Sequence, residues 1–401
     1  MTGSLLALVA VGKQDKDLIG NPTVSFFKNV YQRHTHFSIE SIPVQFDQSL
    51  TFGQKSSMVI PRKGDLLSKM VLEITLPSLG PNIAWINAVG HMIIKEITLE
   101  IGGVKIDSHT GEYLEILNSL ELGDSKRSGY YQMIGKNLYY NKYSTIAPTL
   151  FIPLQFWFCR HIGHSLPLVG LQYHEVKITI ELRPFSECWY SGPDMASIPE
   201  PLQTIEGQIH CDYIFLAAQE RTYFAKQEQK YLIEQVQKDD GNEISEKVTA
   251  ANVDVHFNHP VKDIYWIYKP EGIKVTNDWL NFSKSLNYAE ENTQPEEAIT
   301  YCQWKINGID LMAEKKSTFF RSVIPYQFYT RIPDKFIYVH TFGTDPLKYQ
   351  PTGHLNFSML NSATLFLRFS DNIPVGSITI YARNYNILEI KSGQACLLYS
   401  S

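Results

Sequence analysis

Short apolar segments of strand length recur along the chain, and they constrain its fold more than any other feature. They are rich in β-branched and aromatic residues, and Gly, Pro and Asn lie between them. Short strands at such regular spacing are typical of antiparallel β-sandwiches, whereas a parallel sheet requires crossover helices between strands. We therefore predict an all-β fold. The predicted strands are 70–76, 96–101, 104–107, 151–158, 175–182, 208–215, 231–236, 252–257, 264–268, 303–306, 336–342, 363–369 and 377–381.

Two segments have a helical pattern instead. Apolar residues recur at helical spacing in residues 111–122, which predicts a short helix. Residues 219–229 are polar and charged, and they lie where a connector between two domains would lie. A chain of 401 residues is too long for one ordinary core and suits two domains of roughly 200 residues each. We therefore expect two sandwich domains joined by this connector.

The two halves of the chain echo one another in four places, in the same order along the sequence. Each echo is weak by itself, because short β segments resemble each other by chance. Four echoes in register favour a duplicated sandwich. The paired segments are 100–107 with 305–310, 151–156 with 336–341, 167–178 with 351–366, and the aromatic strands around Tyr213 and Tyr381.

Charge and cysteine content argue against several classes of protein. The net charge is −5, so the chain lacks the basic field that attracts nucleic acid, and we expect no direct nucleic-acid binding. The five cysteines are widely spaced and odd in number, which argues against a disulfide scaffold and for a reducing compartment. The apolar run Leu5–Val11 is far shorter than the roughly 20 residues that span a bilayer. We expect synthesis in the cytosol.

Cys159, His161 and His164 are the strongest candidate metal ligands, since one thiol and two imidazoles lie within six residues. Zinc requires four such ligands in a tetrahedron, and no second cluster supplies the fourth; His174 and His109 are unsupported candidates. We interpret the group as loop histidines beside a buried cysteine.

Other polar groups favour structural roles over chemistry. His34 and His36 share one face of an extended segment, and we interpret them as solvated or interface side chains. Glu220 and Arg221 suit a connector that braces the two domains. The sequence has no nucleophile elbow, P-loop or dinucleotide fingerprint. We therefore expect no enzyme, with no catalytic, cofactor-binding or metal-binding residues and no cofactor.

Residues 20–41, GNPTVSFFKNVYQRHTHFSIES, closely resemble the N-terminal signature of major capsid proteins of nucleocytoplasmic large DNA viruses. The phycodnavirus-like branch looks nearest. The resemblance covers the whole chain from about residue 5 onward. Further matching blocks are 64–65, 100–107, 166–176, 212–222, 231–235, 257–260, 350–353 and 381–387.

The resemblance implies a double jelly roll, which is two consecutive eight-stranded antiparallel jelly-roll β-sandwiches with short helices in the loops and connector. The expected parts are an extension on the inner capsid face, a first jelly roll, a connector and a second jelly roll. The residues themselves, a strand-like segment after the Asn-Pro turn at Asn21, predict a first strand at Thr23–Phe27. Three two-lobed copies would form a homotrimer of nearly hexagonal outline that tiles a shell facet. The expected boundaries are 1–20, 21–217, 218–230 and 231–401.

The resemblance also implies partners and a location. The partners are neighbouring capsomers, minor capsid proteins under the shell that residues 1–20 would contact, and an inner membrane only indirectly. The location is the icosahedral capsid of a large double-stranded DNA virus, assembled in the host cytoplasm. Glycans occur on outward loops in the resembled family. The sequons at Asn281 and Asn356 are possible acceptors, although sequons in a cytosolic protein are mostly accidental.

Three alternatives stay open at this point. A poxvirus-like scaffolding protein would share the fold but leave the particle before maturity, so abundance in mature virions separates the two. A β-sandwich carbohydrate-binding module would be a soluble monomer with an exposed aromatic platform. An enzyme would depend on Cys159, His161 and His164, and stoichiometric zinc would support it.

Overall fold

The computed structural model describes residues 2–79, 83–136, 149–191, 204–285 and 295–399. The chain divides into two compact units, residues 1–36 and 37–401. The first unit, here called the arm, holds α1 (Gly3–Val9), a 3-10 turn (Lys13–Asp15) and α2 (Lys16–Ile19). Its described residues are exposed apart from half-buried Asp15. The predicted strand Thr23–Phe27 is wrong, because the segment has no partner strand for its backbone hydrogen bonds.

The first half of the second unit contains a four-stranded sheet in the order β1-β11-β4-β8 and another in the order β3-β9-β6-β7. All of their neighbouring strands pair antiparallel. Short strands β2, β5 and β10 lie outside this pattern. The strands are β1 (Phe37–Gln45), β2 (Leu50–Thr51), β3 (Lys55–Val59), β4 (Leu66–Thr75), β5 (Ile83–Trp85), β6 (Ile94–Ile101), β7 (Val104–His109), β8 (Thr149–Pro153), β9 (Val176–Leu182), β10 (Trp189–Ser191) and β11 (Thr204–Leu216).

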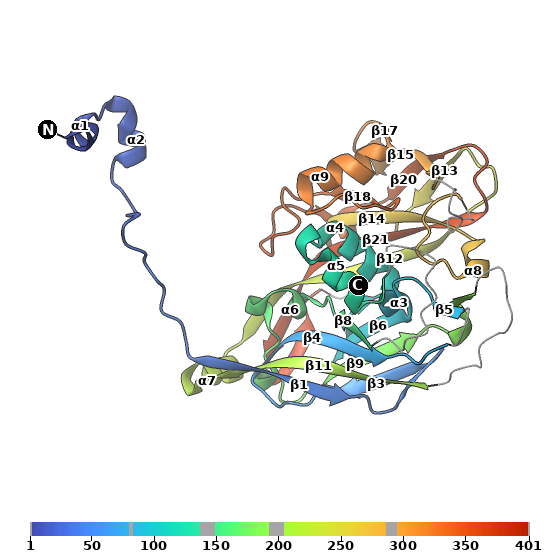
Figure 1. Cartoon of the computed structure of the whole chain (residues 1–401), viewed down its shortest axis with the longest axis horizontal. Helices are drawn as coiled ribbons and strands as arrows, with labels where there is room; N and C mark the ends of the chain where they lie inside the picture. The colour runs from blue at the N-terminus through green and yellow to red at the C-terminus, as the bar shows by residue number, and fades with distance from the viewer. Residues whose placement is uncertain (1, 80–82, 137–148, 192–203, 286–294, 400–401) are drawn as a thin grey trace. The chain divides into compact units, whose positions relative to one another are not determined.

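The second half repeats this topology strand for strand, in the orders β12-β21-β14-β18 and β13-β20-β15-β16 (Figure 1). Short strands β17, β19 and β22 are additions. The strands are β12 (Gln229–Ile244), β13 (Ala250–Asp254), β14 (Pro260–Pro270), β15 (Ile299–Ile306), β16 (Ile309–Asp310), β17 (Lys315–Lys316), β18 (Tyr338–Thr341), β19 (Leu355–Asn356), β20 (Ala363–Phe369), β21 (Gly376–Lys391) and β22 (Gln394–Leu397).

Two sandwiches, each with eight principal strands in the same antiparallel order, make a double jelly roll, which confirms the predicted fold class. The four sequence echoes fall on equivalent strands of the two sandwiches. The first echo is a tight hairpin in both. Gly102 and Gly103 have φ of 60° and 80°, and Asn307 and Gly308 have φ of 50° and 76°. Two consecutive positive φ values suit the twist of a two-residue hairpin and favour Gly and Asn.

The helices lie in the connections between strands. The predicted helix 111–122 is confirmed as α4, and the predicted connector helix as α7. The predicted strand 151–158 is correct only at its start, because β8 ends at Pro153, which has no N–H to donate to a ladder, and a helical turn follows. The helices are α3 (Val89–Met92), α4 (Gly111–Glu121), α5 (Asp124–Met133), α6 (Trp157–Arg160), α7 (Ala218–Lys226), α8 (Ile273–Thr276) and α9 (Ile324–Phe328).

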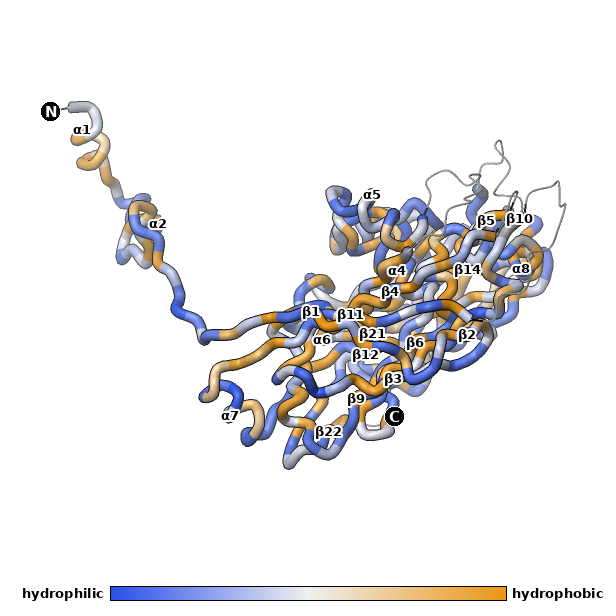
Figure 2. The backbone as a smooth tube through the Cα atoms, turned by 60° about the horizontal axis from the view of Figure 1, so that its bottom comes forward, coloured by the Kyte–Doolittle hydropathy of each residue, from blue (hydrophilic) through white to orange (hydrophobic). Residues whose placement is uncertain are grey.

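Two apolar clusters hold the second unit together. One fills the interior of the second sandwich. The other fills the first sandwich and continues onto the outer face of the β12-β21-β14-β18 sheet, where it includes Tyr265, Val339 and Tyr381. Hydrophobic and hydrophilic residues alternate along the strands in Figure 2, as expected where only one face of a strand is buried. The two sandwiches therefore share a buried interface.

Candidate functional site between the two jelly rolls

Helix α4 lies in the interface between the sandwiches. The side chain of Thr110 caps it by accepting a hydrogen bond from the Tyr113 amide at 3.2 Å. Every residue from Gly111 to Leu120 is buried. A side chain at Gly111 would come within 2.0 Å of the His91 carbonyl oxygen, so close approach requires glycine here. The helix thus fills a space with no room for a larger residue at its start.

Aromatic rings join α4 to the outer face of the second sandwich. The Tyr113 ring lies 6.5 Å from the Tyr265 ring and 5.7 Å from the Tyr381 ring, measured between centroids. The Tyr381 hydroxyl donates to Glu112 Oε2 at 3.1 Å, and Lys269 Nζ donates to the same oxygen at 3.0 Å. The interface therefore combines apolar packing with hydrogen bonds from the second sandwich to Glu112 of the first.

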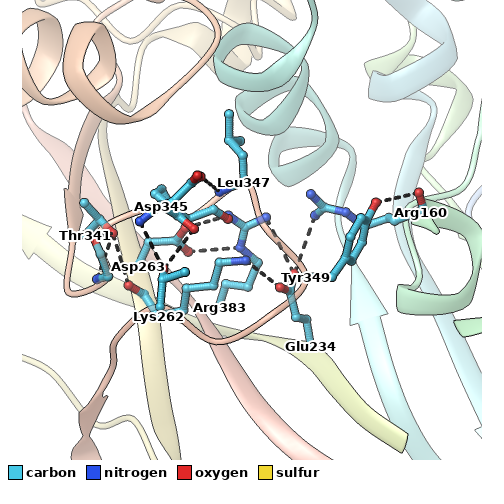
Figure 3. A network of polar contacts seen from close by, with 12 residues as sticks. Arg160, Glu234, Lys262, Asp263, Thr341, Asp345, Leu347, Tyr349 and Arg383 are labelled. Carbon is cyan, nitrogen blue, oxygen red and sulfur yellow. Dashed lines mark hydrogen bonds and ion pairs between the residues drawn. The ribbon is translucent and has the colours of Figure 1, made fainter. Parts of the chain in front are cut away.

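Arg383 on β21 is the centre of a buried ionic network in this interface (Figure 3). Its guanidinium donates to both carboxylate oxygens of Asp263 on β14, with Nε–Oδ1 at 3.1 Å and Nη2–Oδ2 at 2.5 Å. The Tyr329 hydroxyl donates to Asp263 Oδ2 at 3.0 Å. The side chains of Arg383 and Asp263 are 1% and 0% exposed. Burial of such a pair is tolerable only because both partners are hydrogen-bonded.

The network then crosses to the first sandwich. Arg383 Nη1 donates to Glu121 Oε1, at the end of α4, at 2.8 Å. Arg160 on α6 donates to Glu121 Oε2 at 2.6 Å, and it lies 3.9 Å from Glu234 on β12. Lys262 pairs with Glu234. Three cations and three carboxylates from both sandwiches thus balance one another in one cluster.

The pKa values follow from this arrangement. Burial raises the pKa of Glu234, but Arg383, Lys262 and Arg160 outweigh it and hold the pKa at about 2. Burial likewise opposes ionisation of Glu121, and Arg160 and Arg383 lower its pKa below the ordinary value. Burial disfavours charge on Arg383, whereas Asp263 and its other neighbours raise its pKa well above the ordinary value. Glu234, Glu121 and Arg383 are therefore held in their charged forms at neutral pH.

The sequence analysis missed this network. The sequence feature that could have indicated the network is the presence of charged residues inside otherwise apolar strands. Lys262 and Asp263 precede the apolar run of β14, and Arg383 follows two apolar residues on β21. A charged residue in a buried strand requires a partner, but the sequence alone does not name one. The physical role of the network is to fix one orientation of the two sandwiches.

Cys159, His161 and His164 lie beside this interface. Cys159 is buried, and burial raises the pKa of its thiol. The rings of His161 and His164 pack around Tyr349 from the second sandwich, at 4.3 Å and 5.4 Å between centroids. The Tyr349 hydroxyl donates to the Arg160 carbonyl at 2.6 Å. In the described ranges, no group of three or more His, Cys, Asp or Glu side chains could hold a metal ion.

The remaining candidates are a connector residue and two residues of the arm. Arg221 on α7 pairs with Asp65 of the first sandwich at 2.9 Å, so its contact braces the connector against that sandwich. His34 and His36 are exposed residues of the arm.

The two sequons differ in exposure. Asn281 is 3% exposed, and its amide donates to the Ser285 carbonyl at 2.8 Å. Asn356 is half-buried, and its side-chain oxygen accepts from the Ser358 amide at 3.1 Å. A glycan on Asn281 would therefore require local unfolding.

The fold is two jelly rolls joined through a buried interface, and comparisons with known proteins identify the class of protein. A family profile described as "Major capsid protein N-terminus" matches residues 25–217. A second, described as "Large eukaryotic DNA virus major capsid protein", matches residues 220–396. The major capsid protein of Pyramimonas orientalis virus is 34% identical, and that of Paramecium bursaria Chlorella virus 1 is 32% identical, each over 100% of both chains.

Solved structures are similar over nearly the whole chain as well. A chain of the PBCV-1 virus capsid has a TM-score of 0.82 at 29% identity, and the match covers 94% of this chain and 100% of that one. The Faustovirus major capsid protein has a TM-score of 0.76 at 15% identity and covers 97% of this chain and 96% of that one, a likeness of fold alone.

The chain belongs to the family of major capsid proteins of large eukaryotic DNA viruses. The resemblance seen in residues 20–41 and beyond is thereby confirmed. The members reported above are structural proteins, so the chain is a capsid subunit and not an enzyme. None of the described helices is long and apolar enough to cross a membrane.

Proposed function

We propose that three copies of this chain form a pseudo-hexagonal capsomer, and that these capsomers tile the icosahedral shell of a large double-stranded DNA virus. The observation that carries the proposal is the rigid pairing of two jelly rolls of identical topology. A three-fold assembly of such subunits has six similar lobes, and objects of nearly hexagonal outline fill a flat facet. Family membership supports a place for this geometry in a viral shell.

The proposal divides the chain into an extension, residues 1–20, a first jelly-roll domain, residues 21–217, a connector, residues 218–230, and a second domain, residues 231–401. The pairing of the strands supports it, since strands up to β11 pair among themselves and strands from β12 onward pair among themselves. We assign the extension to contacts with minor capsid proteins beneath the shell. In its support, the apolar side chains of α1 are exposed in the described arm, among them Leu5, Leu6 and Leu8.

Other partners follow from charge and exposure. The acidic balance of the chain supports a subunit that tiles a facet without gripping the genome and that meets an inner membrane only indirectly. If a surface glycan is present, we assign it to Asn356, which is the more accessible of the two sequon asparagines. Assembly in the host cytoplasm fits five cysteines without disulfides in the described structure. The proposal assigns no catalytic, cofactor-binding or metal-binding residue.

Electron microscopy of the purified full-length chain tests the proposal. We expect ring-shaped trimers with two lobes per subunit, and light scattering should give three times the mass of the 45.9 kDa chain. A stable monomer at micromolar concentration would contradict it. In purified mature virions the chain should be abundant, whereas a scaffolding protein would be lost. Stoichiometric zinc that disappears in His161→Ala would contradict the absence of a metal site.

A further inference from the structure

A pocket of about 210 Å³ lies between the two sandwiches. Glu112 of α4 lines it from the first sandwich, and the second sandwich contributes the ends of β12, β14 and β21 and the loop after β14. Helix α8, in this loop, lies at one end of the body in Figure 1, and the connector helix α7 lies at the other. Both sandwiches therefore build the pocket at the end remote from the connector.

One wall of the pocket is the indole of Trp279, which is half-buried. The Arg183 guanidinium of the first sandwich lies 4.4 Å from the ring centroid, and the indole Nε1 donates to the Glu187 carbonyl at 2.9 Å. Arg183 does not itself line the pocket, so the part of the ring that does is left uncovered. The two contacts hold the ring in place in advance, and a rigid aromatic wall loses little conformational freedom when a ligand binds.

A second wall is the ion pair of Glu112 and Lys269. Lys269 Nζ donates to Glu112 Oε2 at 3.0 Å, and Arg183 donates to Oε1 at 3.4 Å. The side chains of Glu112 and Lys269 are 7% and 17% exposed. These charges already have partners within the fold, so a ligand does not need to supply a counter-charge.

The other charged groups of the lining are exposed. Lys274 pairs with Glu271 at 3.3 Å. Glu243 makes no ion pair with any residue that the structure describes, so its carboxylate is free to accept from a ligand. The lining as a whole has three carboxylates and two ammonium groups. It therefore offers both acceptors and donors with little net charge, which suits a neutral ligand that carries hydroxyls better than an ion.

Size and wall chemistry narrow the class of ligand. The pocket is smaller than the sites of roughly 300 Å³ and more that hold drug-sized molecules, so it suits a single small ring. A sugar ring has an apolar face of C–H groups that packs against an indole. Its hydroxyls both donate and accept, as this lining requires.

We propose that the pocket binds one neutral sugar ring of a glycan. The ring packs on Trp279, donates a hydroxyl hydrogen bond to Glu243 and accepts one from Lys269. Since the two sandwiches both contribute, the site exists only where they are joined. Binding itself is a property of one chain and does not depend on the proposed trimer.

The direction in which the pocket faces rests on the proposed function. In that proposal the extension meets proteins beneath the shell. It leads through the arm to Phe37, which pairs with Leu216 at the start of the connector. The α7 end of the body would then face inward, and the pocket at the opposite end would face outward. A sugar ring bound there would belong to a glycan on the outside of the particle.

Saturation-transfer NMR of the full-length chain tests the site, with the methyl glycosides of glucose, galactose, mannose and N-acetylglucosamine as probes. We expect at least one of them to bind with a Kd in the millimolar range, as is usual for so small a ligand. No signal from any of the four would overturn the proposal. Binding of tetramethylammonium or acetate in place of the glycosides would also overturn it, because the pocket would then select an ion.

Substitutions locate the bound ring. Glu243→Met should weaken binding about tenfold, the effect of one hydrogen bond to a charged acceptor. Glu246→Met is the matched control, since Glu246 is 60% exposed and lies outside the lining. It should bind as the wild type does. An unchanged Kd in Glu243→Met, or an equal loss in Glu246→Met, would place the ring elsewhere and overturn the site.

A pair of variants at Trp279 isolates its aromatic face. Trp279→Phe and Trp279→Leu both lose the hydrogen bond to Glu187, but only the first keeps an aromatic ring. Trp279→Phe should retain binding and Trp279→Leu should lose it. Equal binding by the two folded variants, with folding checked by circular dichroism, would overturn the role of the ring.

A glycan of the host surface and a glycan carried by the shell share this chemistry. Binding of the protein to host-cell envelopes that is lost after periodate treatment of the envelopes identifies a host glycan. Binding to glycosylated virion proteins that is lost after their periodate treatment identifies a shell glycan. Loss in neither arm would overturn a glycan as the natural ligand. A monomeric wild type that binds a glycoside would overturn the proposed trimer alone, and a trimer that binds none would overturn the pocket alone.

Discussion

Arg383 shows how a single residue connects the two sandwiches. Its guanidinium reaches Asp263 on the neighbouring strand and Glu121 on the helix of the other sandwich. Arginine suits this position because its planar fork donates in two directions at once and stays charged when buried. A buried ion pair contributes modest net stability, but it strongly disfavours any orientation that leaves its charges unpaired.

Arg383→Met should destabilise the protein by about 3–5 kcal/mol, because it leaves buried Asp263 without its paired cation and leaves Glu121 paired with Arg160 alone. Urea unfolding followed by tryptophan fluorescence measures the effect. Arg368→Met is the matched control. Arg368 is 54% exposed and pairs with Glu314 on the surface, so its loss should cost less than about 1 kcal/mol. Equal effects of the two substitutions would refute the role given to the network.

The depressed pKa of Glu234 predicts acid sensitivity. Its folded-state pKa of about 2 lies below the ordinary value of 4.5, so its stabilising contribution is complete above pH 4.5 and is lost as pH falls toward 2. The gap in melting temperature between wild type and Glu234→Gln should therefore be widest at neutral pH and shrink on acidification. Glu246→Gln, at a 60% exposed side chain, should track the wild type throughout. A constant gap would contradict the prediction.

At the scale of elements, the start of α4 is held by a single side chain, that of Thr110. Thr110 caps the helix and also exchanges a hydrogen bond with the Tyr381 hydroxyl at 2.9 Å. One side chain therefore fixes the start of the helix and its contact with the second sandwich.

Thr110→Ala should cost about 1–2 kcal/mol in unfolding free energy, because a cap and an interface hydrogen bond are lost together. Thr222→Ala is the control. Thr222 is an exposed residue inside α7 that bonds only its own helix backbone, at the Ala218 carbonyl, and its loss should change stability by less than about 0.5 kcal/mol. Thermal unfolding of both variants measures the two changes in stability. A Thr110→Ala protein as stable as the wild type would count against the prediction.

At the scale of the whole molecule, the arm and the body have different tasks. Deletion of residues 2–20 should leave the melting temperature and the trimer unchanged, because none of these side chains is fully buried in the described arm. Incorporation into shells should fall, since the exposed apolar residues would lose their proposed partners on the inner face.

Serine at Leu5, Leu6 and Leu8 should reproduce the loss expected on deletion of residues 2–20, whereas serine at Lys13, Gln14 and Lys16 should not. Co-sedimentation of tagged variants with virions from infected cells measures incorporation. Normal incorporation of the truncated chain would contradict the role given to residues 1–20.

Much of the fold was readable from the sequence because its signals are local. Alternating hydrophobicity identified the strands, helical spacing identified α4, and the small residues of 102–103 and 307–308 marked equivalent hairpins. The error at Thr23–Phe27 has the opposite cause. Its residues have strand propensity, but a strand forms only where a partner supplies hydrogen bonds, and propensity does not report that.

The sequence by itself determined two β-sandwiches of repeated order, because strand periodicity and turn chemistry are properties of neighbouring residues. Only the tertiary structure decided how the sandwiches join. Glu121 and Arg383, which bond at 2.8 Å, are 262 positions apart in the chain. No local pattern couples them, since their pairing depends on how α4 and β21 pack.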